Sequence, residues 1–196
     1  MQLLHQTISK LKGFKEWFDT LSLHESQLVL GLSGSVKHLA ESCAFEKLDK
    51  QLVIVTPTLL QATQTYEELS EWYDDEVVHL FPVEESLAAD FSVVSPDVVS
   101  QRIRTLDFLS RGEKGIVIVP LSGIQKLLVP VAVWKKSSIE LAMGSEIESM
   151  DAFVEQLVEL GYRRENMVAT PGEFALRGSI VDIYPLDQEY PLRLDF

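Results

Sequence analysis

Residues 52–81 read LVIVTPTLLQATQTYEELSEWYDDEVVHLF, and this stretch decides the fold of the first half of the chain. An apolar run over Leu52–Val55 is followed by a helical pattern over Leu59–Tyr73 and a second apolar run over Val77–Phe81. Apolar strands that alternate with helices form βαβ units, in which the strands run parallel. The sequence therefore predicts a parallel sheet with helices packed against it.

The same alternation continues on both sides of this stretch. It predicts a strand over Gln27–Leu30, a helix over Val36–Phe45, a loop over residues 83–96, a helix over Asp97–Ser110 and a strand over Ile116–Val119. An amphipathic pattern before the first of these strands predicts a separate helix. We therefore expect an N-terminal helix within residues 1–24 and a doubly wound α/β domain over residues 25–122.

The pattern changes after residue 122. Short strands are predicted over Ile139–Met143, Met167–Thr170, Phe174–Leu176, Ile180–Tyr184 and Leu192–Phe196, with one helix over Met150–Leu160. Ser149 is a suitable N-cap for that helix. Residues 123–196 are therefore predicted to form a small α+β domain with a mainly antiparallel sheet. Because the chain ends within an alternating run, we expect this domain to be truncated and the chain to be a fragment.

Composition limits the classes of function. The 196 residues include 17 basic and 30 acidic side chains, and the resulting net charge of −13 opposes binding to duplex DNA. The single cysteine excludes an internal disulfide, and the four histidines lack metal-ligand spacing, so we expect no metal site. Neither a signal peptide nor a membrane span is evident. We expect a cytoplasmic protein with no membrane partner.

The glycine-rich stretch after Leu30 resembles a phosphate-binding loop in which two positions have changed. In the pattern G-x-x-x-x-G-K-[ST], Gly31 and Lys37 are in place. Val36 replaces the second glycine, and His38 replaces the hydroxyl residue that holds Mg²⁺. We interpret Gly31, Gly34 and Lys37 as a degenerate Walker A motif and expect it to be inactive. Because no other motif indicates a catalytic residue, we predict no enzyme activity and no cofactor for these 196 residues.

The most informative segment reads GYRRENMVATPGEFALRGSIVDIYPLDQEYPLRLDF, residues 161–196. Alternation places Arg177 on the opposite strand face from Phe174. Arginine and aromatic side chains on a sheet edge are typical anchors of a protein interface. The alternative is that the arginines of this segment only pair with nearby carboxylates, namely Glu165, Glu173 and Asp182. The residue pattern alone leaves both interpretations open.

Beyond these patterns, the chain resembles a known family. The residues that carry the resemblance most strongly are Phe174-x-x-Arg177-Gly178-x-x-x-Asp182-x-Tyr184-Pro185 and Pro191–Phe196. They resemble bacterial transcription-repair coupling factors (Mfd). The resemblance also covers Gly161-Tyr162-Arg163, the changed Walker A motif, Phe81-Pro82 and Ile116–Pro120, and these segments follow one another in the same order as in that family. The excision-repair helicase UvrB is similar more distantly. UvrB keeps an intact Walker A motif, whereas the motif here is changed. UvrB also has a long aromatic hairpin, whereas the stretch that corresponds to it here, residues 83–96, is short.

The resemblance implies an adaptor. Residues 25–122 would be a degenerate, helicase-like lobe, and residues 123–196 would be most of a domain that binds the damage sensor UvrA. From their positions in the family's motifs, the resemblance implies that the residues that contact UvrA are Arg163, Arg164, Phe174 and Arg177. For the full-length protein the resemblance implies RNA polymerase, DNA and the protein's own C-terminal domain as further partners. It also implies an ATP-dependent translocase, with ATP and Mg²⁺ bound in domains that this chain lacks.

Two alternatives to the adaptor stay open on the sequence. The first is a UvrB-like, ATP-binding helicase lobe that acts in excision repair, which nucleotide binding would distinguish from an adaptor. The second is direct DNA binding by the arginines of residues 161–196, which the net charge of −13 opposes.

Overall fold

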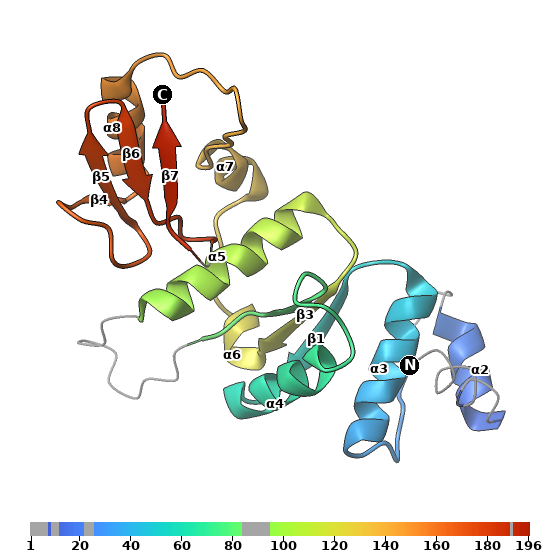
Figure 1. The fold of residues 1–196 in the computed structure, drawn as a ribbon. Helices are drawn as coiled ribbons and strands as arrows, with labels where there is room; N and C mark the ends of the chain where they lie inside the picture. Colours follow the sequence, from blue (N-terminus) through green and yellow to red (C-terminus); the bar gives the residue numbers. More distant parts are fainter. Residues whose placement is uncertain (1–7, 9–11, 22–25, 84–94, 189) are drawn as a thin grey trace. The chain divides into compact units, whose positions relative to one another are not determined.

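The computed structural model describes residues 8, 12–21, 26–83, 95–188 and 190–196 (Figure 1). Contacts divide the chain into two compact units. Unit 1 comprises Met1–Val83 and Gly112–Lys126, and unit 2 comprises Glu84–Arg111 and Leu127–Phe196. Each unit has its own sheet and its own hydrophobic core.

Unit 1 is built on a parallel sheet, as the βαβ pattern predicts. Its elements are α2 (Lys12–Thr20), α3 (Ser35–Leu48), β1 (Leu52–Thr56), α4 (Leu59–Ser70), β2 (Val78–Leu80), β3 (Ile116–Pro120) and α6 (Leu121–Ile124). The strand order is β1-β3-β2, so the last of the three strands in the chain lies in the middle. All five residues of β3 are buried. Burial on both faces of a central parallel strand explains its continuous apolar sequence.

The core of unit 1 forms where α4 packs on the sheet. Thr58 precedes the helix, and its hydroxyl accepts a hydrogen bond from a backbone N–H of the first turn at 3.3 Å. The helix then places Ala62 and Leu69, both 0% exposed, in one cluster with Ile116 and Ile118 of β3. A capped amphipathic helix on an apolar strand is therefore the arrangement that positions the rest of this unit.

The strand predicted over Gln27–Leu30 is wrong. These residues have no regular secondary structure, and Leu28 and Leu30 are 83% and 79% exposed. The three consecutive apolar residues Leu28–Leu30 carry no strand period, so they need a neighbouring sheet edge, and none pairs with them in the described part of the chain. The strand–loop–helix geometry of a P-loop, and with it the helicase-like architecture, is therefore not confirmed. The loop predicted over residues 83–96 lies largely outside the described residues.

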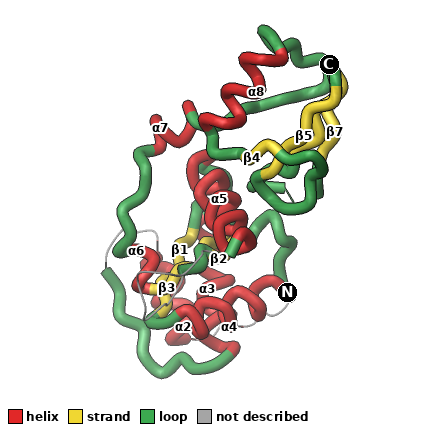
Figure 2. The backbone as a smooth tube through the Cα atoms, turned by 90° about the vertical axis from the view of Figure 1, so that its left-hand side faces the viewer, coloured by secondary structure: helices red, strands yellow, loops and turns green. Residues whose placement is uncertain are grey.

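Unit 2 has a four-stranded mixed sheet. Its elements are α5 (Pro96–Arg111), α7 (Val131–Lys136), α8 (Met150–Glu159), β4 (Arg163–Arg164), β5 (Glu173–Arg177), β6 (Ile180–Ile183) and β7 (Leu192–Asp195). The strand order is β4-β5-β6-β7, and α8 lies on one side of the sheet (Figure 1, Figure 2). β4 and β5 are parallel, whereas the other two pairs are antiparallel. The antiparallel part agrees with the sequence prediction.

The core of unit 2 forms between α8 and the sheet. The Ser149 hydroxyl accepts a hydrogen bond from the Ala152 backbone N–H at 3.1 Å, which confirms the predicted N-cap. The helix then packs Phe153 and Leu157 against Phe174 of β5. These three side chains are 4%, 1% and 0% exposed, so they fix the position of β5 in the unit.

Two strands predicted for unit 2 are absent from the structure. At Ile139–Met143, the Ser145 backbone N–H donates to the Ala142 carbonyl at 3.0 Å, which closes a turn instead of a strand pair. At Met167–Thr170, two backbone N–H groups donate to the Glu173 carboxylate and are not available to a neighbouring strand. Periodicity does not reveal such local hydrogen bonds. The short elements α6, α7 and β4 were not predicted.

The predicted domain limits, residues 25–122 and 123–196, remain a prediction. The contact grouping differs from them mainly in α5, which belongs to unit 2. The described part of the predicted N-terminal helix is α2. Within the described ranges, no helix combines the length and the apolar character needed to cross a membrane.

Candidate protein-binding surface

The sheet of unit 2 has an apolar face toward α8 and a polar outer face. The strand register places Ala175 opposite Asp182 and Asp182 opposite Arg193, so these three residues share the outer face. Phe174 belongs to the other face and is 0% exposed. Its aromatic ring therefore supports the sheet from within the core and is not available at the surface.

Two arginines are held by carboxylates on neighbouring strands. Arg163 Nη2 lies 3.7 Å from Glu173 Oε1, and Arg193 donates from Nε and Nη2 to the two oxygens of Asp182 at 2.6 and 2.9 Å. The side chains of Arg163 and Arg193 nevertheless remain 69% and 65% exposed. Local pairing and availability to a partner are therefore compatible, and the two interpretations of the sequence do not exclude each other.

Two further arginines line a hollow beside β4 and β5. Arg177 Nη2 donates to the Asn166 carbonyl at 3.1 Å. This polar hollow has a volume of about 380 Å³, and it is lined by Arg164, Glu165, Asn166, Leu176 and Arg177. We call Arg163, Arg164, Arg177 and Arg193 together the arginine surface. The three predicted contact arginines and Arg193 thus all lie on the sheet of unit 2. The register places Arg163, Arg177 and Arg193 on its outer face, whereas Arg164 pairs with Phe174 and lies on the other face, at the edge strand β4.

The carboxylates that pair with Arg163 and Arg193 are stabilised in their charged forms. Hydrogen bonds from the Ala169 and Thr170 backbone N–H groups lower the pKa of Glu173, and the charge of Arg163 acts in the same direction. The hydrogen bond from Arg193 lowers the pKa of Asp182, with a smaller contribution from the charge of Arg177. Both carboxylates are therefore charged at neutral pH, and the two-point contact with Asp182 orients the guanidinium of Arg193.

The residues interpreted as a degenerate Walker A motif lie just before α3 and in its first turn. Gly31 and Gly34 have φ angles of 85° and 56°, which favour glycine, and Gly34 is the N-cap residue of α3. Lys37 Nζ lies 3.6 Å from Glu41 Oε1. The imidazole of His38 lies between two carboxylates, at 2.9 Å from Glu41 and 3.6 Å from Glu68. The charges around this helix end are therefore unfavourable for a phosphate group.

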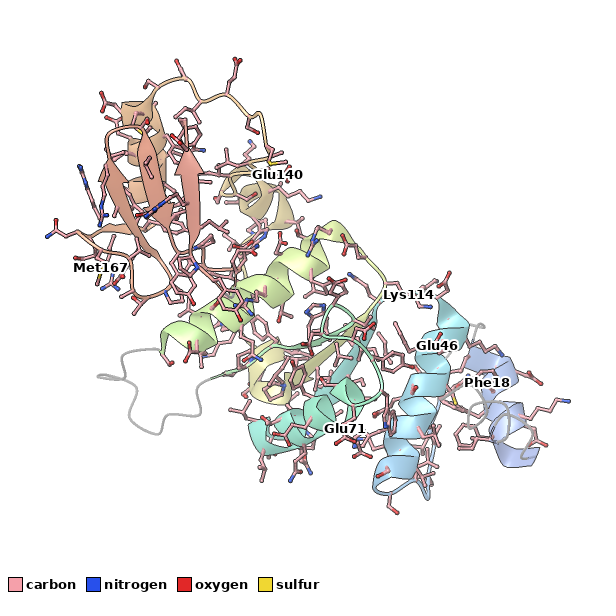
Figure 3. All side chains as sticks on the ribbon, viewed as in Figure 1. Phe18, Glu46, Glu71, Lys114, Glu140 and Met167 are labelled. Atoms are coloured by element: carbon pink, nitrogen blue, oxygen red, sulfur yellow. The ribbon has the colours of Figure 1, made fainter. Side chains whose placement is uncertain are left out.

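Two features of unit 2 have no signal in the sequence. Met167 is 73% exposed at the edge of the unit beside β4 and β5 (Figure 3). A second, mostly apolar hollow of about 600 Å³ is lined by residues of α5, α7, α8 and β7, including Trp134 and Leu160. Because distant segments contribute to this hollow, only the fold brings its residues together. Among the described residues, no group of His, Cys, Asp and Glu has the arrangement of a metal site.

A protein-family model matches the C-terminal part of the chain. Residues 139–196 match the family model described as the UvrB interaction domain. This range contains α8, the whole mixed sheet and the arginine surface.

Proteins called transcription-repair-coupling factor are similar over most of the chain. The chain is 43% identical over 179 residues to one from Staphylococcus epidermidis, which is 91% of the chain and 15% of that relative. It is 39% identical over 176 residues to one from Bacillus subtilis, which is 88% of the chain and 15% of that relative. It is 38% identical over 193 residues to one from Staphylococcus haemolyticus, or 98% of the chain and 16% of that relative. The chain thus spans a small part of the length of these relatives.

Proposed function

Because the chain is homologous to the N-terminal region of transcription-repair-coupling factors, we propose that it is a non-catalytic adaptor that recruits UvrA to transcription-coupled excision repair. The observation that carries this proposal is the exposed arginine surface within the residues that match the UvrB interaction domain. Arginine side chains are enriched among the residues that dominate binding energy at protein interfaces. Their charge selects a partner that presents carboxylates.

The proposal gives different roles to the four predicted contact residues. Arg163, Arg164 and Arg177 contact the partner directly because all three are exposed. Phe174 acts from the core, where it holds β5 against α8. Arg193, held by both oxygens of Asp182, extends the contact to β7.

The proposal assigns no reaction and no cofactor to these residues. The pairing of Lys37 with Glu41 supports this view, because the lysine that would neutralise a phosphate already has a carboxylate neighbour. In the full-length protein, ATP, Mg²⁺, DNA and RNA polymerase would be bound by other domains, and its C-terminal domain would be a further partner. We place the protein in the bacterial cytoplasm, where these partners act.

Calorimetric titration of the chain into purified UvrA tests the adaptor directly. We expect the parent to bind and the Arg164→Ala variant to bind about tenfold more weakly, which corresponds to about 1.4 kcal/mol. Arg111→Ala is the matched control, because Arg111 is an exposed arginine of unit 2 on α5. If the folded parent does not bind UvrA, or if both variants lose affinity equally, the proposal is wrong.

The UvrB-like, ATP-binding alternative predicts a different result. A ligand that binds only the folded state raises the melting temperature of the protein. The rise increases with the ratio of the ligand concentration to the Kd. We expect Mg·ATP at millimolar concentration to leave the melting temperature of the chain unchanged. A rise that disappears in the Lys37→Ala variant would support the nucleotide-binding lobe instead.

A further inference from the structure

The loop of residues 165–172, between β4 and β5, is fastened at both ends. The Glu165 backbone N–H donates to the Phe174 carbonyl at 2.8 Å, and the Gly172 backbone N–H donates to the Tyr184 carbonyl at 2.8 Å. Since Phe174 lies in the core, the loop is tied to a strand that is packed in the core of unit 2.

Two side chains of β5 also hold the interior of this loop. Glu173 Oε2 accepts hydrogen bonds from the Ala169 and Thr170 backbone N–H groups, both at 2.9 Å. Arg177 Nη2 donates to the Asn166 carbonyl at 3.1 Å. The Glu173 side chain is only 12% exposed, so it is placed to hold the loop and not to touch a partner. These bonds satisfy backbone groups on both sides of Met167, which restricts the conformations available to the loop.

Met167 is the apolar residue that this arrangement presents to solvent. It is 73% exposed, and the hollow lined by Arg164 and Arg177 includes its neighbour Asn166. Methionine and arginine are both enriched in interfaces relative to the rest of the surface. The unbranched thioether side chain also adapts to recesses of irregular shape. An exposed methionine on a restrained loop beside two arginines is therefore suited to contact a partner.

We propose that Met167 is an apolar contact residue of the arginine surface and that Glu173 positions it by holding the loop of residues 165–172. This inference rests on the proposed function and adds to the chemistry of the partner. The partner presents carboxylates for the arginines and, beside them, an apolar recess that receives the thioether side chain. Glu173 is a positioning residue, because it acts through the loop.

Titration of UvrA with three methionine variants tests the contact. We expect Met167→Ser to weaken binding by about fivefold or more, whereas Met167→Leu keeps the affinity within about twofold because the apolar volume is retained. Met143→Ser is the matched control, because Met143 is a fully exposed methionine of unit 2. It follows Glu140, which lies on the other side of the unit from Met167 (Figure 3). Binding of Met167→Ser with the affinity of the parent would overturn the contact.

A double-mutant cycle tests the positioning role. Glu173→Ala removes the acceptor of both loop N–H groups and is expected to weaken binding, whereas Glu173→Gln keeps an acceptor oxygen and restores part of the affinity. In the Glu173→Ala background, Met167→Ser is expected to have less effect than in the parent, because the loop no longer presents the side chain in one position. Additive losses would show that the two residues act independently and would overturn the positioning role.

The two proposals fail in distinguishable ways. If Arg164→Ala weakens binding and Met167→Ser does not, the adaptor stands and the inference about Met167 is wrong. If the folded parent does not bind UvrA at all, the proposed function is wrong, and the inference fails with it.

Discussion

Glu173 and Phe174 are adjacent residues of β5 with opposite surroundings. Phe174 is 0% exposed in the core, and Glu173 accepts hydrogen bonds from the loop that carries Met167. Phe174 therefore fixes the sheet, and we propose that Glu173, the residue before it, organises the binding surface. Substitutions at the two positions are expected to affect different measurements.

Replacement of Phe174 by alanine should mainly reduce stability. Removal of a fully buried phenylalanine typically costs about 3–5 kcal/mol, because apolar contacts are lost and a cavity remains. We expect urea unfolding of Phe174→Ala to show a loss in this range. Arg164→Ala, a surface substitution, is expected to change the free energy of unfolding by less than about 0.5 kcal/mol. Equal losses in the two variants would contradict the placement of Phe174 in the core.

The carboxylate of Glu173 should make the loop of residues 165–172 sensitive to acid only below the usual range of glutamate. Its pKa is lowered in the folded state by the hydrogen bonds from Ala169 and Thr170. The stabilisation is therefore present above the ordinary carboxyl pKa and is lost as the pH falls through the lowered value. We expect the amide NMR signals of Ala169 and Thr170 to shift below about pH 4.3, the usual pKa of glutamate. The shift should be absent from Glu173→Gln. A midpoint at or above the usual pKa would contradict these hydrogen bonds.

At the scale of elements, the cap of α8 determines how firmly the core of unit 2 is held. The Ser149 hydroxyl accepts a hydrogen bond from Ala152 in the first turn, and the helix buries Phe153 and Leu157. We expect Ser149→Ala to lower the free energy of unfolding of unit 2 by about 0.5–2 kcal/mol. Ser149→Asp keeps an acceptor and adds a favourable charge at the helix start, so it should restore stability. Equal stability of Ser149→Ala and the parent, measured by urea unfolding, would show that the cap contributes nothing.

The success of the sequence predictions differed between elements for physical reasons. β1 and β3 were predictable because each is a short, continuous apolar run bounded by a proline, and α4 because its apolar residues recur with the period of a helix. Gln27–Leu30 has the composition of a strand but no pairing partner among the described residues, and pairing is a tertiary property. Met167–Thr170 also has the composition of a strand, but Glu173 binds the backbone N–H groups that a strand would need.

The candidate site was predictable only in part. The family resemblance of residues 161–196 implied a contact role for Arg163, Arg164 and Arg177, whereas the residue pattern alone left open whether the arginines bind a partner or only pair with nearby carboxylates. The same reasoning included Phe174 as a contact residue, although strand alternation had placed it opposite Arg177 and the structure buries it. The exposure of Met167 could not be predicted, because it depends on hydrogen bonds that restrain the loop of residues 165–172.

At the scale of the whole molecule, the arginine surface is an exception to the net charge. The chain carries −13 overall, which opposes general attraction to DNA, while four exposed arginines gather on one sheet. Charges at solvent-exposed positions are screened over a Debye length of about 8 Å at physiological ionic strength. In the proposed function, the arginines therefore act at short range on an acidic partner, and we expect the remaining acidic surface to oppose binding to nucleic acid.

This charge distribution predicts a salt-dependent affinity for UvrA. We expect the Kd measured by calorimetry to rise as the salt concentration increases from about 0.05 to about 0.3 M, because screening weakens exposed charge pairs. The same chain at low salt should not retard duplex DNA in a gel. A Kd that is independent of salt would indicate an apolar interface and would contradict the role of the arginines.

Amide hydrogen exchange of the chain, alone and with saturating UvrA, tests the central claim most directly. It measures contact in the intact chain without substitutions and reports on both units at once. We predict new protection in residues 163–177 and 192–195 of unit 2, with the exchange of α3, β1 and α4 in unit 1 unchanged. Protection confined to unit 1, or no change in either unit at saturation, would contradict the assignment of the arginine surface as the site of UvrA recruitment.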